Sequence, residues 1–88
     1  MCRNITALRG LEPSATPEEI TAAALQYVRK VAGISTVTPR TADAVDRAVR
    51  RIAEATVDLI EELPERRTPP PTEPPMRRRA AHRHAVTA

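Results

Sequence analysis

Apolar residues recur at three- and four-residue spacing in two stretches of the chain, a pattern typical of amphipathic helices. The first stretch opens with a capping box, in which the Thr16 hydroxyl and the Glu19 carboxylate can each accept from the other residue's backbone amide. Gly33 follows it, and glycine readily adopts the left-handed conformation that ends a helix. We therefore predict a helix from about Pro17 to Ala32. Its apolar stripe comprises Ile20, Ala23, Ala24, Tyr27, Val28 and Val31.

The second stretch predicts a longer helix that ends near Pro64. Two starts are compatible with its sequence, one at Thr38-Pro39 and one at Thr41-Ala42-Asp43, because threonine is a suitable N-cap in both. The β-branched run at 34–37 between the helices is too short for a sheet, so we treat it as a connector. Two helices joined by a short connector predict an antiparallel two-helix hairpin. The second apolar stripe comprises Val45, Ala48, Val49, Ile52, Thr56, Leu59, Ile60 and Leu63.

The residues before the first helix also carry apolar side chains at regular spacing. Ile5, Leu8 and Leu11 are three positions apart, which favours a short α or 3₁₀ segment with its apolar side chains on one surface. We expect this N-terminal segment to cover one side of the hairpin.

Composition changes sharply after Leu63. Six of the nine prolines lie between Pro64 and Pro75, and proline clusters favour an extended conformation over a helix. Residues 1–64 hold eight basic and nine acidic groups, whereas residues 65–88 hold six arginines and two glutamates. We therefore expect a nearly neutral helical domain at 1–63 and a disordered Pro/Arg-rich tail at 64–88.

The core of so small a domain should be thin. The chain has 88 residues, no Phe or Trp, and Tyr27 as its one aromatic side chain. Scaffolds of this size usually need a disulfide, a metal or a partner subunit for stability. The single cysteine excludes an intramolecular disulfide, and we expect no metal or cofactor. Self-association of two hairpins into a four-helix bundle is therefore the expected source of stability.

Several short motifs together resemble a known family. They are Met1-Cys2-Arg3-Asn4-Ile5, Leu8-Arg9, Ala15-Thr16 with Glu19-Ile20, and the run from Ala22 to Val31 that ends at Gly33. This combination is similar to the small bacterial family called domain of unknown function 2277, over roughly residues 1–63. That family often has Pro-Ser and Phe where this chain has Thr38-Pro39 and Val45. The resemblance implies no activity, and it implies that the tail is an extension.

Cys2 is the candidate with the most reactive chemistry. Removal of Met1 would place a free α-amine beside its thiol, a pair that can act as a nucleophile if Arg3 or Arg29 lowers the pKa of the thiol. No His or Asp base is near in sequence, so we favour an ordinary thiol. A second candidate is an anion site, whose members are Arg3, Asn4, Gln26, Arg29 and Lys30. Cations that offset the dipole at a helix end are the simpler interpretation of that group.

The tail carries candidates for nonspecific nucleic-acid contact. They are Arg77, Arg78, Arg79 and Arg83, with His82 and His84 beside them. The tail has no aromatic residue for base stacking, so a solubilising extension is the favoured interpretation.

Enzyme signatures are otherwise missing from the sequence. It has no glycine-rich phosphate loop and no histidine before residue 82. No window has the length of apolar sequence that a membrane helix needs, and the first twenty residues lack the apolar core of a signal peptide, so we expect a cytoplasmic protein. The leading hypothesis is a non-enzymatic helical interaction module that forms a homodimer. The alternatives are a site built on Cys2 and Arg29, and weak nucleic-acid binding through the tail.

Overall fold

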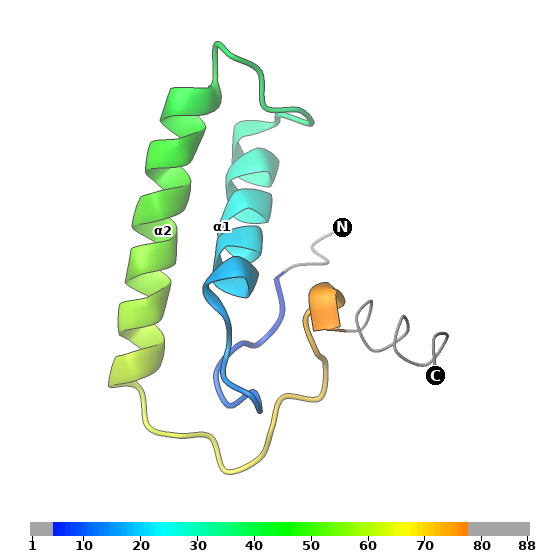
Figure 1. Ribbon diagram of the computed structural model, residues 1–88, viewed down its shortest axis with the longest axis vertical. Coiled ribbons are helices and arrows are strands. Elements are labelled where there is room, and N and C mark those ends of the chain that lie inside the picture. Colours follow the sequence, from blue (N-terminus) through cyan, green and yellow to red (C-terminus); the bar gives the residue numbers. More distant parts are fainter. Residues whose placement is uncertain (1–4, 78–88) are drawn as a thin grey trace.

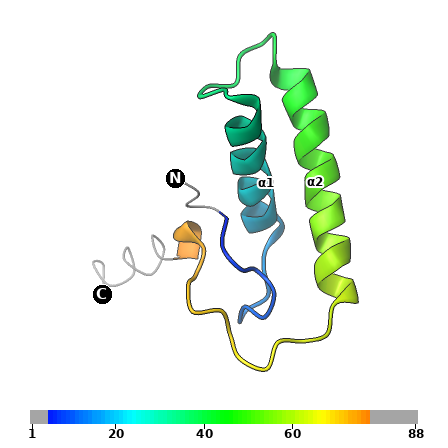
Figure 2. The same cartoon turned by 180° about the vertical axis from the view of Figure 1, so that it is seen from behind.

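The computed structural model describes residues 5–77, which contain two long helices and no strand (Figure 1). Helix α1 spans Pro17–Ala32 and helix α2 spans Ala42–Glu62. The two helices run antiparallel and side by side, as opposite views agree (Figures 1 and 2). The predicted all-α class is confirmed, and the first helix has its predicted limits.

Local sequence accounts for both ends of α1. The Glu19 amide donates to Thr16 Oγ1 at 3.1 Å, and the Thr16 amide donates to Glu19 Oε1 at 2.8 Å, which completes the predicted capping box. Gly33 ends the helix with φ 70° and ψ 33°, and its amide donates to the Arg29 carbonyl. The left-handed conformation at this position is one that glycine adopts without a steric penalty.

Helix α2 begins at the second of the two predicted starts. Residues 38–41 form a turn in which the Thr38 carbonyl accepts from the Thr41 and Ala42 amides at 3.0 and 2.9 Å. Thr41 Oγ1 accepts from the Thr38 amide at 3.0 Å, so its side chain closes this turn instead of capping α2. The helix ends at Glu62, two residues before Pro64.

The predicted N-terminal helical segment is wrong for residues 5–16, which form turns and extended chain. The chain reverses at Gly10, whose φ of 89° is incompatible with a right-handed helix. Leu8 and Leu11 are nevertheless buried, whereas Ile5 is 44% exposed. The segment therefore covers the hairpin with two of the three expected side chains. Turns in the chain, and not a helix, place these two side chains against the hairpin.

The core is thin, as the composition indicates. Besides three prolines of residues 64–77, five apolar residues are buried among the described ones, and no large side chain there is completely enclosed. The apolar stripe of α2 is buried only at Val45, while Leu59 and Leu63 are 54% and 38% exposed. The remaining buried apolar residues are Leu8, Leu11, Ile20 and Ala24.

Residues 64–77, called here the C-terminal segment, run from the end of α2 to the N-terminal segment and the start of α1 (Figures 1 and 2). Pro70, Pro74 and Pro75 are buried in this segment, and a helical turn forms at residues 75–77. The disordered tail expected from residue 64 stays a prediction; among the described residues of this segment, the Arg77 side chain binds Glu19 and the Pro13 and Ser14 carbonyls. Residues 78–88 lie outside the described part of the chain.

Candidate functional site

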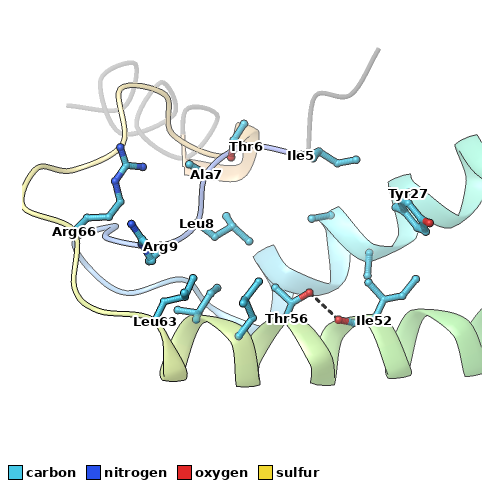
Figure 3. Close-up of a pocket in the computed structure, with 14 residues that line it drawn as sticks. Ile5, Thr6, Ala7, Leu8, Arg9, Tyr27, Ile52, Thr56, Leu63 and Arg66 are labelled. Atoms are coloured by element: carbon cyan, nitrogen blue, oxygen red, sulfur yellow. Dashed lines mark hydrogen bonds between the residues drawn. The ribbon is translucent and has the colours of Figure 1, made fainter.

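One cavity lined by described residues is an open, largely apolar groove of about 470 Å³ (Figure 3). One wall is the N-terminal segment from Ile5 to Arg9, and the other is α2 from Ile52 onward with Leu63 directly after it. Between them α1 contributes the small side chains of Ala23 and Ala24. The volume falls within the range of small-molecule sites, which are typically apolar and concave.

Apolar side chains on the groove are exposed to an unusual degree. Tyr27 is 51% exposed and Leu59 is 54% exposed, and Ile5 and Leu63 are also exposed. Apolar side chains scattered singly over a surface need no explanation, but four around one concavity are typical of an interaction site.

The two arginines that line the groove lie at one end of it. Figure 3 shows Arg9 and Arg66 beside Leu63, and Ile5 and Tyr27 toward the opposite end. Neither arginine makes a hydrogen bond or an ion pair within residues 5–77. The groove therefore has an apolar end and a cationic end.

Gly10 fixes where the Arg66 side chain lies. A Cβ at Gly10 would stand 3.0 Å from Arg66 Cβ and Cδ, so the aliphatic stem of Arg66 packs directly on the glycine backbone. Because φ at Gly10 is +89°, the turn that accepts this stem also favours glycine. Arg66 is thus held at the groove by the backbone of the N-terminal segment.

Two threonine hydroxyls also line the groove. Thr56 Oγ1 donates to the Ile52 carbonyl at 2.7 Å and so is satisfied within α2. Thr6 Oγ1 is buried and has no hydrogen-bond partner among residues 5–77. Thr6 therefore leaves one unpaired polar atom in the wall formed by the N-terminal segment.

The second functional feature is a buried ion pair between α1 and the C-terminal segment. Arg77 Nε donates to Glu19 Oε2 at 2.6 Å, and Arg77 Nη2 donates to Glu19 Oε1 at 3.0 Å. The same Nη2 donates to the Pro13 and Ser14 carbonyls at 2.6 and 3.0 Å. The exposed side-chain fractions are 14% for Arg77 and 4% for Glu19. This bidentate pair fastens the C-terminal segment to the start of α1.

The environment of Glu19 keeps its carboxyl ionised. Burial acts to raise the pKa of Glu19, but hydrogen bonds from Arg77 and from the Thr16 amide outweigh it, and the pKa lies below its ordinary value of 4.5. The hydrogen bond to Glu19 correspondingly raises the pKa of Arg77. The pair is therefore fully charged at neutral pH.

The residues of the predicted anion site are divided by the structure. Cys2, Arg3 and Asn4 lie outside the described residues. Arg29 and Lys30 are exposed near the end of α1, and Arg29 Nη2 donates to the Ser35 carbonyl in the connector. Gln26 is half-buried. None of these three helix residues lines the groove, which takes Tyr27 from the same helix instead.

Of the predicted nucleic-acid contacts, Arg77 is the one that the structure describes. Its guanidinium is occupied by Glu19 and two backbone carbonyls, so it does not extend into solvent. Arg78, Arg79 and Arg83 lie outside the described residues, as do His82 and His84.

Sequence reasoning missed both features that the structure brings together. Glu19 is explained by its cap alone, and its partner lies 58 positions away with no periodicity to connect them. The groove depends on Arg9 and Arg66, which local patterns do not single out. One signal for the ion pair was present in the sequence. Glu19 lies on the apolar side of the first turn of α1, and a buried carboxylate needs a cation as its partner.

Neither described helix is long and apolar enough to cross a bilayer. Residues 5–77 also contain no cluster of three His, Cys, Asp or Glu side chains that could hold a metal ion.

Comparison with known proteins places the chain in a family. It belongs to the uncharacterised conserved proteins of DUF2277, whose sequence model matches residues 1–85. The predicted family is confirmed, but the match continues through the C-terminal segment, so residues 64–85 belong to the family region and are not an extension. No curated protein and no solved structure matches the chain.

Proposed function

We propose that this protein is a non-enzymatic binding module and that the apolar groove is its binding surface. The observation that supports the proposal is the group of exposed apolar side chains around one concavity, Tyr27 and Leu59 above all. The hydrophobic effect makes an apolar occupant favourable there, because it would remove these side chains from water.

A neutral environment-sensitive dye tests the proposal. N-phenyl-1-naphthylamine carries no charge and brightens in apolar surroundings, so it should bind the full chain and fluoresce. Leu59→Asp should weaken dye binding at least tenfold, because it places a charge on the groove wall. Val57→Asp is the matched control, since Val57 lies on the same helix, is 36% exposed and does not line the groove. Equal loss in both variants, or no dye binding at all, would contradict the proposal.

The homodimer predicted from the sequence is a second candidate, favoured by the thin core. A second copy could cover the groove and add the buried apolar area that the single chain lacks. Sedimentation equilibrium over a hundredfold range of concentration tests it. A dimer that Leu59→Asp dissociates would support this candidate, and a monomer throughout would remove it.

A further inference from the structure

We infer that the occupant of the groove is a linear alkyl chain with an anionic head, a free long-chain carboxylate being the simplest example. This inference rests on the proposed function and specifies the ligand. It follows from the distribution of charge along the groove and from the shape of its floor.

The polar and apolar parts of the groove are separated along its length. The cations Arg9 and Arg66 stand at one end, while Ile5 and Tyr27 mark the other (Figure 3). A ligand that is apolar throughout would leave the cations without a partner, and a small inorganic anion would leave the apolar walls in water. An amphipathic anion satisfies both ends in a single orientation.

Arg66 is arranged to receive such a head group. Its stem packs on Gly10 and its guanidinium has no partner within residues 5–77. The C-terminal segment that carries it is fastened by the Glu19–Arg77 pair. Less side-chain freedom is then lost when Arg66 binds an anion, which increases the affinity that its charge provides.

Nearby acidic residues do not cancel this charge. Glu12 and Glu65 line a smaller adjoining cavity together with the two arginines, but neither lies within ion-pair distance of them. Both glutamates are exposed, so water screens them. The arginines also line the apolar groove, whereas the glutamates do not.

The floor and the length of the groove favour a narrow chain. Ala23 and Ala24 line the part between the walls, and their side chains are too small to fill it. From Ile52 to Leu63 the helical wall is about 16 Å long. A linear alkyl chain can lie along this wall with its head beside Leu63 and the arginines.

Calorimetric titration with two homologous series tests the inference. The full chain is titrated with n-alkyl carboxylates of increasing length and with the matching primary alcohols, below the concentrations at which micelles form. Affinity should rise about twofold for each added methylene, roughly half of the free energy of complete burial because the groove is open on one side. The gain should cease when the chain exceeds the groove.

Substitution of the arginines separates the contribution of the ligand's head group to affinity from that of its alkyl chain. Replacing both residues, Arg9→Gln with Arg66→Gln, should weaken carboxylate binding about tenfold more than it weakens alcohol binding. Arg67→Gln is the control, because Arg67 is adjacent and exposed but does not line the groove. Circular dichroism confirms that each variant retains its helices.

The possible outcomes are distinguishable. Equal binding of carboxylates and alcohols, or an unchanged carboxylate affinity in the arginine variant, overturns the inference but leaves the proposed function standing. Binding of neither series, together with failure of the dye, overturns both. If the chain forms a dimer that does not bind the ligands, the occupant of the groove is a second copy of the chain. If the protein binds phosphatidylglycerol vesicles but no free carboxylate, the occupant is a membrane lipid. The dimer result and the vesicle result would each overturn the inference.

Discussion

Glu19 and Arg77 form a buried, bidentate ion pair that joins the first turn of α1 to a segment 58 residues later in the chain, with Arg77 Nε 2.6 Å from Glu19 Oε2. Glu19 also completes the capping box with Thr16. One carboxylate therefore stabilises a helix terminus and holds the C-terminal segment in place. That segment carries Arg66 to the groove, so the pair connects the stability of the fold to the proposed binding surface.

Loss of the arginine should be strongly destabilising. Arg77→Ala leaves the Glu19 carboxylate buried without its cation, and we expect the free energy of unfolding to fall by about 3 kcal/mol, measured by urea denaturation. Arg67→Ala is the matched control, because Arg67 is exposed and makes no hydrogen bond or ion pair within residues 5–77. If the alanine variant does not fold, Arg77→Lys should fold with an intermediate stability, because lysine keeps the charge but loses the planar geometry. Equal stability of the Arg77 and Arg67 variants would show that the pair does not hold the segment.

The lowered pKa of Glu19 predicts how stability depends on pH. A carboxyl with a lower pKa in the folded state than in the unfolded chain binds fewer protons when folded, so it stabilises the fold above the unfolded-state pKa. Its contribution should be complete above pH 4.5, the ordinary value, and should be lost as the pH falls below that value through the folded-state pKa. Urea denaturation of the native chain and of Glu19→Gln between pH 7 and pH 2 measures this. The stability difference between the two should shrink over the acidic part of the range, and a constant difference would contradict the prediction.

Gly10 and Gly33 should respond differently to alanine. Both have positive φ, so alanine introduces backbone strain of about 1 kcal/mol at each position. At Gly10 the new Cβ would also meet the Arg66 stem at 3.0 Å, whereas at Gly33 it meets nothing within 4 Å. Gly10→Ala should therefore lower the thermal midpoint further than Gly33→Ala, and the extra loss should become smaller in an Arg66→Ala background, which removes Cγ and Cδ but keeps the Cβ. Equal shifts in both backgrounds would show that Arg66 does not pack on the glycine.

The capping box should contribute a measurable share of stability. Thr16→Ala removes the acceptor for the Glu19 amide, and we expect a loss of about 1 kcal/mol. Thr16→Ser keeps a hydroxyl at the same position and should retain most of the native stability. Thermal unfolding followed by circular dichroism compares the two variants, and a serine variant as unstable as the alanine variant would exclude capping as the cause.

The limits of α1 were predictable because they depend on neighbours in sequence. Thr16, Glu19 and Gly33 each act within a few residues, and the spacing of the stripe is local as well. The start of α2 was ambiguous because Thr38 and Thr41 are both suitable caps. The choice depends on the turn they form with each other, which closes at Thr41.

The path of the terminal segments could not be predicted from local patterns. A helical spacing is present at Ile5, Leu8 and Leu11, but the chain turns at Gly10, and the Gly10 backbone packs against the Arg66 side chain. The partner of Arg77 is likewise distant in sequence, and the arginine is typical of a solvated tail in every other respect. The groove escaped prediction because it depends on which apolar positions remain uncovered. The periodicity of α2 indicates a buried stripe, yet Leu59 and Leu63 in its last part remain exposed.

The most direct test of the binding surface is a chemical-shift map of the full ¹⁵N-labelled chain titrated with a neutral apolar ligand, for which decanol is suitable. Our account predicts that the largest shifts of backbone amides occur along the groove, at Ala23, Ala24, Leu59 and Ile60. The amides of Val37 in the connector and of Arg40 in the turn before α2, at the opposite end of the hairpin, should remain unchanged. Shifts that were absent from the groove, or spread evenly over both ends of the hairpin, would contradict it.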